Sequence, residues 1–528
     1  MDNNNRHVTQ YSWVSNPSAD NNRNHQPKAG WLKGQGNMAQ EIELKLTISE
    51  QSIDDFLALE LLSAYSAETA FLENTYFDTP ARQLTQVGSA LRIRKTPQGY
   101  LQTLKTRGLN SGGLHQRDEW EYGITSNTLE MALFPEQGLP VGLQAEQLEP
   151  LFSTNFTRTS WQITYNLSKI ELVLDLGQVA CQAGSDAISE LELELKDGQL
   201  SDLFALALEI SARVAVMPSD ISKAERGHRI CNGFTDNHVE LPDIVPQQSM
   251  ESAFCALFGY EMERLQRSWQ VFWSSQQWRH LQEFVVTLGN MHTEIEWFQG
   301  MMPKTQIDYA HDQLKWISAT VTPILSWWPA CFALSQDAED EPKSVAISLQ
   351  QSKAKKALKA LRLLQNNPEL GSRILCLTAW LHGQQWRVGQ LAEQVRFGEQ
   401  PVTDGLDYSF DKALNELRTD CFSGSTSNAL SQSPAVHRLL MLCQYFDRLY
   451  GKELGDLRAP LQALEDNLSR LSAIDVVTQL KGWLNDLPFE QQASIHSWTR
   501  SQTVLLRDIK QLANKLISGR EALGESPI

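Results

Sequence analysis

Charged residues recur at every second position in several short segments of the first half of the chain. Glu41, Glu43 and Lys45 alternate with Ile42 and Leu44. The other segments with this spacing contain Arg92 and Arg94, Lys105 and Arg107, Arg117 with Glu119 and Glu121, and Glu190, Glu192 and Glu194. Carboxylates are ligands for hard cations such as Mg²⁺, and Arg and Lys bind phosphate oxygens. A polyphosphate accompanied by a divalent cation would satisfy both sets.

Elements that could position these side chains follow from the hydrophobic pattern. Alternation of polar and apolar residues is typical of β-strands, because successive side chains point to opposite faces. Strands are expected over residues 41–45, 90–95, 100–107, 116–124, 161–165, 171–176 and 189–196. Two helices are expected among them, over about 49–64 and about 201–214. Ile53, Phe56, Leu57 and Leu61 would form the buried face of the first, and Leu203, Leu206, Ala207 and Ile210 that of the second.

The charged strand faces have two interpretations. In the first, they are the solvent-exposed face of an antiparallel sheet, which is common for a single strand. In the second, the sheet closes into a barrel, and the charged faces line a tunnel through it. Five strands with charges gathered in blocks favour the barrel, because like charges on an exposed face repel one another. The helices and the second half of the chain would then cover the apolar outer faces.

The chain of 528 residues is long enough for more than one domain. Residues 1–37 are polar and rich in Asn, so we expect a disordered leader or a tag, with Met38 as a plausible natural start. Residues 38–235 form the strand-rich domain, and 236–248, with Pro242 and Pro246, a linker. Residues 249–520 have helical periodicity, which is typical of an all-α bundle.

Composition excludes several classes of protein. The net charge of −17 argues against a surface that wraps nucleic acid. Between residues 38 and 240 there are 15 Lys and Arg against 29 Asp and Glu, so basic residues must act through their placement. There is no run of about 18 apolar residues that could span a membrane. The seven cysteines contain no C-x-x-C pair, which favours free thiols and a cytoplasmic protein.

The order of several motifs resembles the CYTH, or triphosphate tunnel metalloenzyme, superfamily. Glu41-x-Glu43-x-Lys45 resembles its E-x-E-x-K signature. The motifs that follow in the expected order are Tyr76-Phe-Asp-Thr79, Leu91-Arg-Ile-Arg94, Thr103-Leu-Lys105, Arg117-x-Glu119, Arg158, Asp175, Glu190-x-Glu192 and Ser222-Lys223. The resemblance implies an eight-stranded antiparallel β-barrel tunnel, and hence an α+β chain with the helical bundle behind the barrel.

The resemblance also implies roles for individual residues. A divalent cation, Mg²⁺ or Mn²⁺, would be held by Glu41, Glu43, Glu190 and Glu192, together with Asp175. Glu194 leaves open which two glutamates of its strand take part. The phosphates would be held by Lys45, Arg92, Arg94, Lys105, Arg117, Arg158 and Lys223. Glu119 and Asp175 would complete the acidic set, through a second metal ion or by orienting water. Asp78 is expected to close a turn, and His115 to be a hairpin residue.

The second half of the chain resembles a CHAD domain, a helical module often found behind a CYTH domain. That family carries a helix with His and repeated Arg in each of two repeats, and His292 and His437 are the candidates here. Glu294 and Glu296 stand where basic residues are expected in the first. Lys355, Lys359 and Arg362 share one side of another helix, which is usually a solvated face. The resemblance implies that this part is a scaffold or contacts polyphosphate.

The leading hypothesis is metal-dependent hydrolysis of inorganic triphosphate to pyrophosphate and phosphate, by direct attack of water. Thiamine triphosphatase activity and cyclisation of ATP by a class IV adenylyl cyclase-like reaction use related tunnels. A non-catalytic polyphosphate-binding module is an alternative from another class. The row of carboxylates argues against that module, since binding an anion requires no carboxylates.

Overall fold

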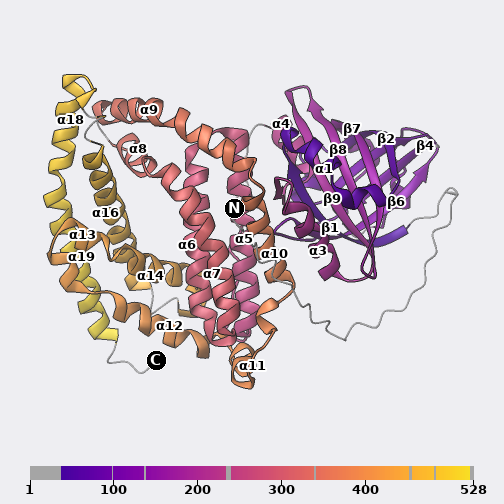
Figure 1. Cartoon of the computed structure of the whole chain (residues 1–528). Helices are drawn as coiled ribbons and strands as arrows, with labels where there is room; N and C mark the ends of the chain where they lie inside the picture. Colours follow the sequence, from indigo (N-terminus) through magenta and orange to yellow (C-terminus); the bar gives the residue numbers. More distant parts are fainter. Residues whose placement is uncertain are drawn as a thin grey trace, which may run out of the picture.

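A computed structural model describes residues 37–523, except 98, 136–137, 233–238, 338–339, 451–454, 481–482 and 484. The expected leader therefore lies outside the described residues, apart from Asn37, and so does the start of the expected linker. The chain folds into a β-barrel followed by a larger helical part (Figure 1). Both parts of the predicted fold class are confirmed.

The barrel is a ring of eight antiparallel strands. In ring order the strands are β1 (Asn37–Ile48), β9 (Gly184–Asp197), β8 (Ser168–Cys181), β7 (Glu149–Tyr165), β2 (Ala67–Asp78), β3 (Ala90–Thr96), β4 (Gly99–Lys105) and β6 (Leu114–Ile124). Pairing of β6 with β1, from Asn37↔Glu121 to Leu44↔Leu114, closes the ring. Short strands β5 (Leu109–Ser111) and β10 (Val216–Pro218) extend it at β6 and β1. Because the ring is closed, the space between the inner faces can be reached only through the two ends of the tunnel.

The apolar outer face of the barrel is covered by helices. Leu44 and Leu46 of β1 and Leu191 and Leu193 of β9 are fully buried in a core outside the barrel. Helix α3 (Leu200–Ser211) packs on this face, and its Leu203, Leu206, Ala207 and Ile210 are buried as predicted. Alternate residues of the same strands, which carry the charges, therefore point into the tunnel.

The helix expected over about 49–64 is broken into three short pieces. They are η1 (Glu50–Ser52), α1 (Ile53–Leu57) and η2 (Glu60–Ala64). Leu59 has an extended backbone, with ψ 127°, and this break turns the side chains of Leu59 and Leu62 into the core. Leu57, which was predicted to be buried, is 49% exposed. Tertiary packing of Leu59 thus overrides the helical periodicity of the segment.

The helical part follows a stretch without regular structure that begins at 239. Its helices are α5 (Met250–Ser275), α6 (Trp278–Phe298), α7 (Lys304–Val321), α8 (Trp328–Ser335), α9 (Asp340–Gln365), α10 (Pro368–His382), α11 (Ala392–Glu399), α12 (Val402–Glu416), α13 (Thr426–Leu430), α14 (Ser433–Tyr445), α15 (Asp447–Tyr450), α16 (Gly455–Gln479), α18 (Phe489–Arg500) and α19 (Gln502–Leu523). Among the described helices, none is long and apolar enough to cross a membrane alone. A bent pair, Lys304–Leu325 with Trp328–Ser335, passes that test by length and composition.

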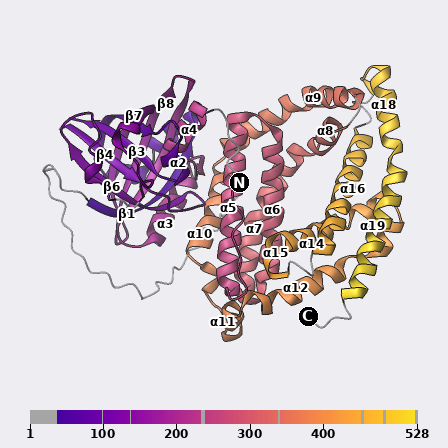
Figure 2. The ribbon, with the colours of Figure 1, turned by 180° about the vertical axis from the view of Figure 1, so that it is seen from behind.

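Helices α5 and α10 form the side of the helical part that faces the barrel, as the view from behind also shows (Figure 2). Leu375 and Ala379 of α10 join the outer core of the barrel. Gly371 of α10 lies so close to β10 that a Cβ atom there would come within 1.6 Å of the Val216 carbonyl oxygen. At the β5–β6 hairpin, Thr378 Oγ1 donates to the Gly112 carbonyl (3.2 Å). The two parts therefore meet at close range.

Candidate active site

Charged side chains line a cavity of about 670 Å³ inside the barrel. The predicted site residues on its wall are Glu41, Glu43, Lys45, Arg92, Arg94, Lys105, Arg117, Glu119, Arg158, Glu192 and Lys223. Asp175 and Glu190 are fully buried and contact Lys223 at this wall. The structure thus brings together every residue that the sequence predicted for the site.

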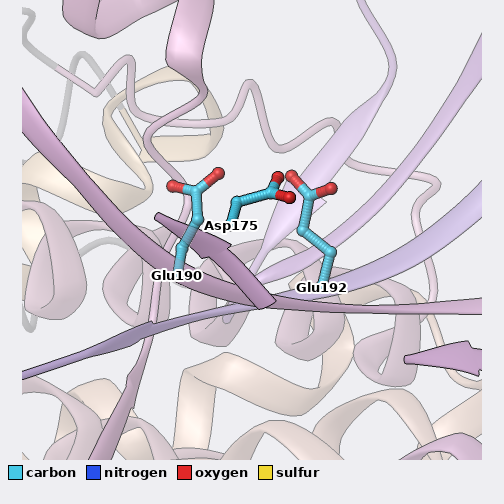
Figure 3. Close-up of side chains that lie close together, drawn as sticks. All are labelled: Asp175, Glu190 and Glu192. Carbon is cyan, nitrogen blue, oxygen red and sulfur yellow. The ribbon is translucent and has the colours of Figure 1, made fainter. Parts of the chain in front are cut away.

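Three of the predicted carboxylates form one compact group, which we call the carboxylate trio: Asp175, Glu190 and Glu192. Each offers an oxygen within 4.8 Å of the others. Their side chains point into the same space from neighbouring strands (Figure 3). Asp175 of β8 stands opposite Glu190 of β9, and Glu192 follows two residues later on the same face. Antiparallel register and the period of two together create this cluster.

Two lysine ammonium groups pair with the carboxylates of the trio. Lys223 Nζ, from the first turn of α4 (Lys223–Asn232), lies 2.7 Å from Asp175 and 2.9 Å from Glu192, and it also contacts Glu190. Lys45 Nζ lies 2.9 Å from Glu192 and 3.5 Å from Glu190. Burial alone would lower the pKa of Lys45, but Glu190 and Glu192 raise it above the ordinary value.

Arg158 of β7 is the third cation of the trio. Its Nε and Nη2 donate to the two oxygens of Asp175 at 2.8 and 2.6 Å, and Nη2 also donates to Glu192 at 2.7 Å. Burial would raise the pKa of Glu192, but Lys223, Lys45 and Arg158 hold it well below the ordinary value. Three cations therefore contact the three carboxylates at close range, and the Arg226 guanidinium lies 3.6 Å from Glu190.

Glu41 and Glu43 form a second acidic group on β1, apart from the trio. Lys105 Nζ donates to the Glu41 oxygens at 2.7 and 2.8 Å. Arg117 Nη2 donates to Glu43 at 2.5 Å, and Arg117 Nε to Glu41 at 3.3 Å. Glu119 lies 3.4 Å from Lys105. The structure therefore divides the five expected metal ligands into the trio and a separate pair that already binds two cations.

Among the described residues, Arg94 forms no ion pair, unlike the other cations that the sequence predicted for the site. Its Nε donates to the Asn74 side chain at 2.9 Å. Burial, together with the like charges of Arg92 and Arg158, lowers its pKa to about 10. A half-buried guanidinium without a carboxylate partner is costly. An anionic ligand would remove this cost.

The trio fits a hard divalent cation. Its donors are carboxylate oxygens, which Mg²⁺ and similar ions prefer. Within the described part of the chain, Glu190 Oε2 is buried and has no hydrogen-bond donor; the Arg226 guanidinium lies 3.6 Å away. Such an unsatisfied oxygen is rare in folded proteins and is available to a metal ion.

Comparison with known proteins agrees with this geometry. A model of the CYTH domain family matches residues 39–228. An inorganic triphosphatase from Haemophilus influenzae is 35% identical over 242 residues, which cover 44% of this chain and 67% of that protein. The chain belongs to the CYTH family.

Solved structures also resemble this CYTH protein. A Hippeastrum protein described as a candidate adenylyl cyclase with a dominant triphosphatase activity has a TM-score of 0.29 and 20% identity, covering 37% of this chain and 98% of its own. The CHAD domain from the plant Ricinus communis has a TM-score of 0.40 and 15% identity, covering 55% of this chain and 98% of its own.

Glu194 stands apart from the other glutamates of β9. Its carboxylate pairs with Lys196 at 2.6 Å and is not part of the trio. Burial raises its pKa to about 7, although Lys196 opposes the shift. The sequence left open which glutamates of this strand act together, and in this CYTH protein Glu190 and Glu192 are the two that lie beside Asp175.

Asp78 and His115 lie outside the carboxylate groups. Asp78 accepts hydrogen bonds from the Thr79 and Leu84 amides, at 2.7 and 3.0 Å, and so fixes the turn before α2 (Gln83–Gln86). His115 follows the hairpin at Gly112, where φ is +71°, and its Nε2 lies 3.0 Å from the Ser219 carbonyl oxygen. Burial, and then Arg117, lower the pKa of His115 to about 4.

Sequence reasoning missed four residues of this site. Arg226 lies 3.6 Å from Glu190, and its spacing of three residues from Lys223 on a helix could have revealed it. Asn74 orients Arg94, and Tyr76, two residues later on β2, lies 3.5 Å from Arg92. Arg267 lines the cavity from α5, in the helical part. No local pattern predicts that last contact, because it depends on how the two parts pack.

The two histidines singled out in the helical part lie in different surroundings. His292 Nδ1 lies 2.7 Å from His311 Nδ1, between α6 and α7. His437 Nε2 lies 2.8 Å from the Asn290 side-chain oxygen. The cationic side of α9, with Lys355, Lys359 and Arg362, is exposed, as expected.

Proposed function

We propose that this protein hydrolyses inorganic triphosphate to pyrophosphate and phosphate inside the barrel tunnel. The observation that carries the proposal is a cavity inside the closed barrel where the carboxylate trio and a set of cations lie together, and where Arg94 has no counter-ion among the described residues. The relative from Haemophilus influenzae, named an inorganic triphosphatase, supports this substrate.

In this proposal the basic residues hold the triphosphate chain. Arg92, Arg94 and Arg158 bind phosphate oxygens as guanidinium forks, and Lys105 and Lys223 as point charges. Arg117 and Lys45 complete the cationic wall. These cations neutralise the charge that develops on the departing pyrophosphate, and as preorganised groups they stabilise the transition state.

The carboxylates have two roles in the proposal. Asp175, Glu190 and Glu192 would hold the divalent cation, Mg²⁺ or Mn²⁺, which when bound supplies Lewis-acid stabilisation of phosphoryl oxygens. Glu41 and Glu43 orient Lys105 and Arg117 and remain candidates for binding a cation. Glu119 or Asp175 orients the water whose oxygen bonds to the terminal phosphorus while the bond to the bridging oxygen breaks. The proton from that water passes to solvent.

Phosphate release from tripolyphosphate, ATP and thiamine triphosphate, with Mg²⁺ or Mn²⁺, tests this proposal. In Glu43→Ala we expect kcat to fall on the order of a hundredfold, as for other preorganised electrostatic groups. Glu73→Ala is a matched control, because Glu73 belongs to β2 but is 46% exposed and pairs with exposed Lys95. No metal-dependent release from any substrate would refute hydrolysis. Unchanged activity in Glu43→Ala would refute the site, and a preference for ATP or thiamine triphosphate would change the substrate.

The helical part and the location of the protein are further parts of the proposal. The exposed cations of α9, Lys355, Lys359 and Arg362, could contact polyphosphate. All seven cysteines are free thiols, which supports a cytoplasmic location. Binding of long-chain polyphosphate by the full chain, compared with a variant in which these three cations are replaced by Gln, tests the first point. Equal binding would exclude α9 as the contact.

A further inference from the structure

The helical part contributes a cation to the tunnel cavity. Arg267 of α5 lies on the cavity wall, and its side chain is only 15% exposed. Its Nη1 lies 2.6 Å from Glu225 Oε1, on α4, and its Nε 2.7 Å from Glu263. Arg229, two turns along α4 from Lys223, lies 2.6 Å from the same Glu225 oxygen. One carboxylate oxygen is therefore shared by two guanidinium groups.

Glu225 and Glu263 are the acidic partners of the two guanidinium groups, so a phosphate that binds there competes with Glu225. The side chains of Glu225, Arg229 and Arg267 are between 10% and 19% exposed, so their charges are only partly screened by water. Burial lowers the pKa of Arg229 although Glu225 opposes it, and the nearby charge of Arg267 lowers it further. Arg107, also on the cavity wall, forms no ion pair among the described residues. The cavity thus extends into a second basic region beyond the trio.

We propose that Arg229 and Arg267 form an anion subsite for the additional phosphate of polyphosphate chains longer than three. The inference rests on the proposed function, in which Lys223 is one of the cations that hold the triphosphate chain. Six residues of α4 separate Lys223 from Arg229, a rise of about 9 Å. The two cations therefore hold different phosphates, and a chain held at Lys223 must extend toward α5 to reach Arg229. In this way the helical part sets the preferred chain length.

Binding of linear tripolyphosphate and tetrapolyphosphate to the full chain, by calorimetry without divalent metal, tests the subsite. In Arg267→Gln we expect tetrapolyphosphate to bind about tenfold more weakly, the loss of one charge-assisted hydrogen bond, and tripolyphosphate to change less than about twofold. In Glu225→Gln tetrapolyphosphate should bind several-fold more tightly, because the competing carboxylate is gone. Arg264→Gln is the matched control. Arg264 lies on α5, is 16% exposed and pairs with Glu261 and Glu283.

Opposite changes in tetrapolyphosphate affinity in the two variants distinguish an anion subsite from a purely structural contact between α4 and α5. If Arg267 only anchors α4, Arg267→Gln and Glu225→Gln will both weaken the binding of both ligands. That result, or an Arg267→Gln variant that binds tetrapolyphosphate like the wild type, overturns the proposal. Because no metal is present and no turnover is measured, failure of triphosphate hydrolysis itself would be seen only in the phosphate-release assay.

Discussion

Replacement of Lys223 by Met should separate metal binding from phosphate binding. Lys223 contacts all three carboxylates of the trio from the place where a metal ion would bind them. In Lys223→Met the trio keeps Lys45, Arg158 and the more distant Arg226, and loses the cation that contacts all three carboxylates. We therefore expect tighter binding of a divalent cation and weaker binding of tripolyphosphate, because the same ammonium repels one ligand and attracts the other.

The size of the change follows from Coulomb's law. A cation that binds the trio must push the ammonium a few Å away, and two unit charges at 4 Å repel by roughly 4 kcal/mol at an effective dielectric constant of about 20. Solvent and rearrangement reduce this value, but about 1.4 kcal/mol already corresponds to tenfold in affinity. We expect at least a tenfold gain for Mn²⁺ without substrate, and at least a tenfold loss for tripolyphosphate.

Titration with Mn²⁺, followed by electron paramagnetic resonance, measures the first change, and calorimetry with tripolyphosphate the second. Lys196→Met is the matched control for the metal. Its ammonium contacts Glu194 and Glu171, not the trio, so Mn²⁺ affinity should change less than about threefold. A loss of Mn²⁺ affinity in Lys223→Met would show that the trio is not the cation site. Unchanged tripolyphosphate binding would show that Lys223 does not hold phosphate.

Three further predictions concern stability. Arg94→Met should raise KM for triphosphate without lowering the thermal midpoint. Arg158→Met removes the charge-assisted hydrogen bonds to buried Asp175, which keeps Lys223 as a partner, and should cost about 1.5–3 kcal/mol by chemical denaturation. Asp220 is buried, and burial raises its pKa to about 7. Stability should therefore fall as the pH rises from about 4 to about 7, because the buried carboxyl group must then lose its proton. Asp220→Asn should stabilise the protein at pH 8, by at most about 4 kcal/mol, but not at pH 4. Gly371→Ala should cost about 2 kcal/mol or more and expose the interface to protease, whereas Gly289→Ala, with open space around it, should not.

The barrel could be predicted because its signal is local and repeated. Glu41, Glu43 and Lys45 fix the inward face of β1 by alternation alone, and five strands with charged faces are inconsistent with a simple solvent face. The same logic placed Glu190 and Glu192 on one face of β9. Alternation does not predict how neighbouring strands are aligned. The trio forms because Asp175 of β8 is paired with Glu190 of β9. Hence the site residues were predictable as a set, but their division into two groups was not.

Other features escaped prediction because they depend on contacts between distant segments. The break at Leu59 follows from packing of its side chain against the barrel, which helical periodicity does not reveal. In the sequence Asn74 is an ordinary strand residue. Only the pairing of β2 with β3 shows that its side chain accepts a hydrogen bond from Arg94. Arg267 belongs to another part of the chain altogether. In each case the missing information is a tertiary contact rather than a local preference.

Electrical balance explains why so many charges can be buried in one barrel. Each buried ion is costly unless it is paired, and the trio is matched by Lys45, Arg158 and Lys223, while Glu41 and Glu43 are matched by Lys105 and Arg117. A metal ion and a triphosphate that bind together compensate both halves of each displaced pair, whereas either ligand alone leaves one half without a counter-ion and should bind more weakly. The charged groups that lack a close ion-pair partner therefore indicate the functional site better than the total number of charges does. Among the described residues, Arg94, which forms no ion pair, and Glu190 Oε2, which has only the Arg226 guanidinium at 3.6 Å, are such groups; the first would bind an anion and the second a cation.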